Sequence, residues 1–131
     1  MKEILTVIRM NQINATKAAL VAAGFPSFTA CRVMGRGSRP VDFAVVAAAT
    51  AEEPVPEAVA SLSATPRLMA KRMLSVVVPD GAVGRVVQTI IQANRTGRPG
   101  DGKIFVLPVG DAARVRTGET GARAVSEMSA E

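Results

Sequence analysis

The order of strand-type and helix-type hydrophobic patterns restricts the fold of this chain more than any other feature. Apolar residues with helical spacing occur in two segments. The segment after Pro79-Asp80 has five apolar residues at offsets of three, four, seven and eight, which place them on one helix face: Val83, Val86, Val87, Ile90 and Ile91. The other begins at Asn11 and ends at the stop signal Gly24-Phe25-Pro26, and its shared face holds Ile13, Thr16, Leu20 and Val21.

Strand-type segments lie around these two helices. Residues 2–9 are rich in β-branched and apolar side chains and predict a strand covered on both faces. Three further strands are predicted at 27–34, 68–78 and 103–109, and residues 112–119 predict a short edge strand or extended segment. The order strand, helix, strand, strand, helix, strand is the ferredoxin-like βαββαβ plan, with two helices on one face of an antiparallel sheet. We therefore predict an α+β fold whose other sheet face is covered by subunit association.

A long segment without sustained periodicity separates the second and third predicted strands. This segment, residues 38–67, contains several prolines and an acidic pair. A loop of this length is unusual inside a compact domain. Its alanine-rich centre is compatible with a short helix or strand formed on a partner, and equally with disorder. The 131 residues otherwise fit a single domain, residues 1–131, with a flexible tail from about residue 120.

Composition excludes several classes of function. The chain has no His and only one Cys, Cys31, so the common catalytic bases and transition-metal clusters are missing, and we predict no catalytic residues, no metal site and no enzyme activity. The chain has a net charge of +5, and most of its basic residues are Arg, which suits binding of phosphate or carboxylate. Four Phe without Trp or Tyr supply few stacking surfaces for nucleic acid. The lone Cys31 and the absence of an apolar N-terminal run predict a cytoplasmic protein without membrane insertion.

The strongest local motif is the glycine-rich run TGRPGDGK at 96–103. It matches the G-x-x-x-x-G-K half of a phosphate-binding P-loop, but Ile104 stands where Ser or Thr would reach magnesium and a strand follows instead of a helix. Glycines still let backbone N–H groups approach an anion, and Lys103 adds a charge. An ordinary glycine turn is the alternative. Arg114 and Arg116, two apart on an extended segment, would project from one face toward a phosphate, although a solvated pair is equally ordinary.

Four blocks of sequence resemble the PII family of nitrogen signal-transduction proteins and follow the family order: GFPSFTA-RVMGRG, KRMLSVVVPD, TGRPGDGKIFV and RVRTGETG. Within the family they are most similar to the nitrogenase-associated PII-like regulators, in particular the second of two paralogues that act together. The resemblance implies a trimer of ferredoxin-like subunits with ATP or ADP bound between neighbours. The matching positions that would line this cleft from one subunit are Thr29, Gly35, Gly37, Thr96, Gly100, Asp101, Gly102 and Lys103. Arg114 and Arg116 would reach the phosphates from the adjoining subunit.

The resemblance also identifies residues 38–67 with the partner-binding T-loop of the family, and Lys71 with the lysine near bound 2-oxoglutarate. Ser38-Arg39 stands where the family has Arg-Gln, and this departure bears on 2-oxoglutarate binding. In the family, this glutamine helps to ligate the magnesium ion that 2-oxoglutarate chelates. Arg39 could instead only bind the carboxylates of 2-oxoglutarate directly. The chain has no Tyr, so the tyrosine uridylylation used by some family members cannot occur.

These observations predict a nucleotide-sensing regulator. It would bind ATP or ADP, with Mg²⁺ and 2-oxoglutarate as further ligands, and would control nitrogenase or nitrogen metabolism through protein binding by the T-loop. The expected assembly is a homotrimer or a mixed assembly with a PII-like paralogue, with a nitrogenase component as partner and no direct contact with nucleic acid. Two alternatives stay open: a divergent regulator of a transporter, carboxysome or other metabolic partner, and a slow nucleotide hydrolase.

Overall fold

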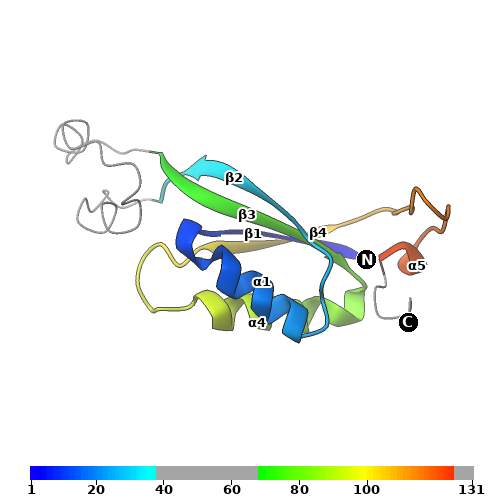
Figure 1. Ribbon diagram of the computed structural model, residues 1–131, viewed down its shortest axis with the longest axis horizontal. Helices are drawn as coiled ribbons and strands as arrows, with labels where there is room; N and C mark the ends of the chain where they lie inside the picture. The colour runs from blue at the N-terminus through cyan, green and yellow to red at the C-terminus, as the bar shows by residue number, and fades with distance from the viewer. Residues whose placement is uncertain (38–67, 126–131) are drawn as a thin grey trace.

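The computed structural model describes residues 1–37 and 68–125 of the 131-residue chain. In chain order its elements are β1 (Lys2–Arg9), η1 (Met10–Gln12), α1 (Ile13–Ala22), β2 (Thr29–Gly35), β3 (Met69–Val78), η2 (Asp80–Ala82), α4 (Val83–Asn94), β4 (Lys103–Pro108) and α5 (Ala122–Val125). The four strands form one antiparallel sheet in the order β2-β3-β1-β4, and α1 and α4 pack together on one of its faces (Figure 1). The predicted α+β, ferredoxin-like plan is therefore confirmed.

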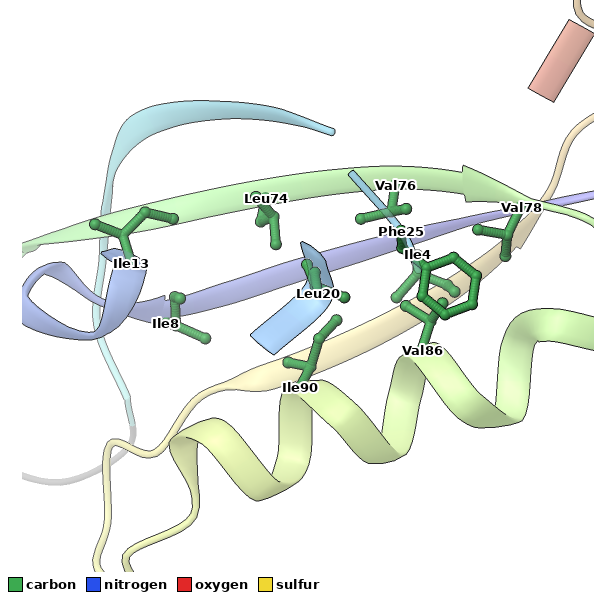
Figure 2. Packing of buried hydrophobic residues seen from close by; sticks show 10 residues of the cluster. All are labelled: Ile4, Ile8, Ile13, Leu20, Phe25, Leu74, Val76, Val78, Val86 and Ile90. Atoms are coloured by element: carbon green, nitrogen blue, oxygen red, sulfur yellow. The ribbon is translucent and has the colours of Figure 1, made fainter. Parts of the chain in front are cut away.

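The hydrophobic core lies between the sheet and the two helices. Antiparallel pairing sets Ile4 of β1 opposite Val76 of β3 and Val106 of β4, so alternate residues of these strands point toward the helices. The buried apolar side chains are Ile4, Ile8, Ile13, Leu20, Phe25, Leu74, Val76, Val78, Val86 and Ile90 (Figure 2). Because most of them are branched aliphatic residues, each stabilises the fold by roughly 1.5–3 kcal/mol through removal of apolar surface from water.

The opposite face of the sheet is apolar but only partly covered within one chain. Leu5, Val7 and Met73 are half-buried, and Phe105 and Leu107 are 50% and 38% exposed. The register sets Leu5 opposite Phe105 and Val7 opposite Met73, so these side chains share one surface. The prediction that residues 2–9 are covered on both faces is therefore not met by a single chain.

The first helix ends where the sequence predicted. Gly24 has φ +94°, its N–H donates to the carbonyl of Val21 at 3.1 Å, and the N–H of Phe25 donates to the carbonyl of Leu20 at 2.8 Å. These two bonds make a Schellman motif, which requires a residue with positive φ. Val21 itself is 53% exposed, so the prediction that it shares the buried face of this helix is wrong.

Two other predicted segments differ from the structure. The second strand covers Thr29–Gly35 rather than 27–34. Residues 112–119 form no strand: a single bridge pairs Ala113 with Thr120, and the chain between them turns, with the N–H of Gly118 donating to the carbonyl of Arg114 at 2.8 Å. The turn removes the extended geometry from which a common direction for Arg114 and Arg116 was predicted.

Beyond that turn, Ala122–Val125 form the short helix α5, whereas the sequence predicted a frayed tail from about residue 120. No helix in residues 1–37 or 68–125 is long and apolar enough to span a membrane.

Candidate functional site

The glycine-rich loop connects α4 to β4 at one end of the sheet, which we call the loop end. Here β1 finishes at Arg9, β2 at Gly35, and β4 begins at Lys103, next to Val7 of β1. Gly102 shows why glycine is needed: its φ is +117°, and a Cβ there would collide with the carbonyl oxygen of Val7. Only a residue without a side chain lets the loop pass this close to β1.

Asp101 organises the interior of the loop. Its carboxylate accepts hydrogen bonds from the hydroxyl and the N–H of Thr96, the latter at 2.8 Å, and from the N–H of Gly97 at 3.0 Å. The hydrogen bond from the Thr96 hydroxyl is the main cause that holds the pKa of Asp101 far below its usual range, with further contributions from the backbone N–H of Thr96 and from Arg9. The Asp101 and Thr96 side chains are therefore bound to each other within the loop.

Arg9 ties this loop to the sheet. Its Nη1 donates to Asp101 Oδ1 at 2.8 Å and its Nη2 donates to the carbonyl of Pro99 at 3.0 Å. Arg9 is not among the site residues predicted from the sequence. The sequence signal for it is a basic residue at the end of the first strand, which the ferredoxin-like topology places beside the strand that follows the glycine-rich loop.

Positive side chains gather at the loop end. Lys71 lies directly opposite Arg9 in the β1–β3 register, and its side chain is near Gly35, whose Cβ position is 4.0 Å from Lys71 Cγ. Burial, and secondarily the charge of Arg9, lowers the pKa of Lys71. Lys103, the first residue of β4, is exposed. The loop end therefore joins six of the predicted cleft residues: Gly35, Thr96, Gly100, Asp101, Gly102 and Lys103. Gly37 follows β2 there as the last described residue before the gap.

The other predicted residues lie elsewhere on the chain. Thr29 pairs with Ser75 and lines a cavity of about 510 Å³, together with Val77, Arg85 and Val125. This cavity opens on the part of the sheet nearest α5.

The two predicted phosphate-binding arginines follow β4 at the end of the sheet opposite the loop (Figure 1). Arg114 is half-buried, and its Nε donates to the carbonyl of Ala124 in α5 at 3.1 Å, whereas Arg116 is exposed. Since β1 spans eight residues, the two ends of the sheet are about 23 Å apart. One chain therefore cannot bring Lys103 and Arg116 to the same phosphate group.

Part of the predicted site lies outside the described residues. Ser38, Arg39 and the whole T-loop-like segment 38–67 belong to that part, so Arg39 has no described position. In residues 1–37 and 68–125 there is no group of three or more His, Cys, Asp or Glu side chains that could hold a metal ion.

Comparisons with known proteins agree with this architecture. The family model described as nitrogen regulatory protein P-II matches residues 1–119. The chain is 43% identical over 125 residues to "Nitrogen fixation nifHD region GlnB-like protein 2" of Methanothermobacter marburgensis, covering 95% of this chain and 100% of that protein. It is 46% identical over 125 residues to the protein of the same description from Methanobacterium ivanovii, covering 95% and 99%.

A solved structure gives the same result. The crystal structure of Arabidopsis thaliana PII bound to citrate superposes with a TM-score of 0.68 at 31% identity, covering 95% of this chain and 88% of that chain. The resemblance to the second nitrogenase-associated paralogue is confirmed by the descriptions of the two relatives. With a family model matched over residues 1–119, the chain belongs to the PII family of nitrogen regulatory proteins.

Proposed function

We propose that this PII-family nitrogen regulator senses ATP and ADP in clefts between subunits of a trimer and passes the occupancy on to a protein partner through residues 38–67. Proteins of this family are signalling regulators. The observation that carries the proposal is the division of the site: the glycine-rich loop and Arg116 occupy opposite ends of one sheet. A neighbouring copy that brings its Arg116 to the loop end completes the set of phosphate-binding groups.

The loop end supplies the phosphate contacts of one subunit. The N–H groups of Thr96, Gly97 and Arg98 are already bonded inside the loop, so we assign the phosphate to the later residues Gly100–Lys103. Lys103 adds a positive charge there, and the Arg9–Asp101 pair cancels the negative charge that would otherwise repel the ligand.

The neighbouring subunit supplies Arg116 and the cavity that Thr29 lines. Its volume of about 510 Å³ falls within the range of small-molecule pockets, and its walls combine apolar side chains with a few polar ones. We assign the base and sugar of the nucleotide to this cavity.

Subunit association has support of its own. The half-exposed apolar face that carries Leu5, Val7, Met73, Phe105 and Leu107 would be buried when subunits meet. Burial of this face would bring the sheets of neighbouring copies together, and the proposed cleft requires that they pack with the loop end of one copy beside the far end of another.

We assign 2-oxoglutarate as a second ligand at the loop end. Lys71 and Arg9 face each other there, and a bound carboxylate would supply the negative charge that offsets the burial of Lys71 and its repulsion by Arg9, the two causes that lower the pKa of Lys71. The described residues offer no metal-binding cluster, so any magnesium ion would be held largely by oxygens of the nucleotide and of 2-oxoglutarate.

The nucleotide site can be tested by complementation between subunits. We expect Lys103→Ala and Arg116→Ala each to weaken ATP and ADP binding by about 10-fold or more in titration calorimetry, the loss expected for a charged hydrogen bond. Lys17→Ala, at a half-buried residue of α1, and Arg123→Ala, at an exposed residue of α5, serve as charge-matched controls and should bind like the parent. In a randomly mixed assembly of the two defective chains, about one quarter of the clefts carry both intact residues. Recovery of that fraction supports the shared cleft; no recovery contradicts it.

The partner is the least defined part of the function. The two relatives are described as products of a nitrogen fixation gene region, and on that basis we assign a nitrogenase component as partner. Affinity capture of the full chain from nitrogen-fixing cells, with ATP or with ADP, should recover that component in only one nucleotide state. Capture of a transporter or another metabolic protein instead would replace this assignment and leave nucleotide binding untouched.

A further inference from the structure

Among the residues that the structure describes, three buried polar side chains lie in the apolar core beneath the glycine-rich loop. Thr6 of β1 and Thr16 of α1 are 0% exposed, and Asn94, the last residue of α4, is 5% exposed. Buried polar groups are costly unless they are hydrogen-bonded. Every donor and acceptor among the three must therefore be accounted for.

The hydrogen bonds of this cluster determine the orientation of the Asn94 amide. The Thr16 hydroxyl donates its proton to the carbonyl of Gln12 at 2.7 Å, so toward Asn94 it can only accept. Asn94 Nδ2 donates to Thr16 Oγ1 at 3.0 Å and to the carbonyl of Ile90 at 2.9 Å, which uses both amide protons. The Asn94 oxygen must therefore point away from Thr16.

Two atoms of the cluster have no hydrogen-bond partner among the described residues: Asn94 Oδ1 and Thr6 Oγ1, both fully shielded. Both residues line a cavity of about 150 Å³ between α4, β1 and the start of β4. The cavity is walled by Ile8, Ile90 and Ile104, and the glycine-rich loop borders it through Asp101 and Gly102.

The chemistry of the two atoms selects the occupant. Asn94 Oδ1 accepts only, so the occupant must donate to it, which excludes a carboxylate or phosphate. The positive residues Arg95 and Lys103 border the same cavity, and the negative charge of Asp101 there is already paired with Arg9, so a cation is disfavoured. A small neutral molecule that can both donate and accept remains, and the cavity has room for one or more waters.

We infer that this cavity is a hydration site in which an ordered water bridges Thr6 Oγ1 and Asn94 Oδ1. The water links β1 to Asn94, the last residue of α4, after which the glycine-rich loop begins. The loop returns over the same strand at Gly102, so the site supports both ends of the loop. The inference does not depend on what the loop binds.

A crystal structure of the full chain, at a resolution that resolves individual waters, tests this inference. We expect one water within hydrogen-bond distance of both atoms. A direct contact between Thr6 and Asn94 with no water between them, or an ion or additive in the cavity, overturns it.

Variants extend the test to solution. Oxygen-17 magnetic relaxation dispersion should show that Thr6→Val loses about one long-lived water per chain relative to the parent. Thr6→Ser, which keeps the hydroxyl, and Thr89→Val, which removes a hydroxyl from α4 outside the cavity, should keep it. If Thr6→Val fails to fold, the parent and Thr6→Ser crystal structures still decide, because a dry cavity in either contradicts the inference.

Discussion

At the residue scale, Asp101 shows how an acidic side chain can belong to an anion-binding loop. Its charge is paired with Arg9 at 2.8 Å, and its oxygens accept from Thr96 and Gly97. The carboxylate therefore shapes the loop, and the phosphate contacts that we propose fall to the residues around it. Removal of the carboxylate should therefore act on ligand binding mainly through the geometry of the loop and less through the charge of the loop.

Asp101→Asn should lower both the thermal stability and the affinity for ATP. Because the folded pKa of Asp101 lies below its unfolded value, its stabilisation is fully present above the unfolded pKa of about 3.9 and is lost as the pH falls further. The difference in Tm between parent and variant should be constant from neutral pH to about pH 5 and should narrow in more acidic solution. A difference that widens with acid would contradict this role. Asp80→Asn, which alters an exposed carboxylate that lines neither cavity, is the control for ATP affinity.

Gly102 and Gly97 offer a matched pair for the close approach of the loop to β1. Gly97→Ala meets only the strain of a positive φ, +82°, because nothing lies within 4 Å of its Cβ position. Gly102→Ala adds a collision with the carbonyl of Val7 and should destabilise the chain by a further ~1–3 kcal/mol. Urea unfolding at one fixed protein concentration measures both variants. Equal losses would show that β1 does not confine the loop.

At the scale of elements, the end of α1 depends on a single glycine. Gly24→Ala keeps the Schellman hydrogen bonds only by forcing alanine to φ +94°, and we expect a loss of ~1–2 kcal/mol in unfolding free energy. Gly84→Ala is the contrasting variant, since Gly84 lies in α4 with open space at its Cβ position. It should be neutral or stabilise by up to ~1 kcal/mol. A stabilising Gly24→Ala would show that the helix end tolerates another conformation.

At the scale of the whole molecule, the half-exposed apolar face of the sheet should control association. Phe105→Glu combined with Leu107→Glu places two negative charges on that face and should convert the oligomer to monomers in sedimentation equilibrium. Val21→Glu, at an exposed apolar residue of α1 on the other side of the sheet, should leave the oligomer intact. A double variant that stays trimeric would place the interface elsewhere.

Much of the fold could be predicted because local patterns determine it. The bounds of β1, the face of α4 and the glycine that ends α1 all follow from side-chain spacing or from one residue's conformational freedom. Two errors have different causes. Val21 lies about 100° around α1 from the buried Leu20, so it is exposed although its spacing is helical. Residues 112–119 have a strand-like composition, but the chain turns there and Ala113 pairs only with Thr120, just beyond the same segment.

The order of elements, the family and the glycines that let the loop turn could all be inferred from the amino-acid sequence alone. Which side chains meet depends on how the strands pair in three dimensions. Pairing β1 with both β3 and β4 brought Arg9 to Asp101 and Lys71, and set Thr6 beneath the loop beside Asn94. The same pairing separated Lys103 from Arg116 by the length of the sheet. Contacts between residues far apart in sequence depend on strand order and register, which no local pattern encodes.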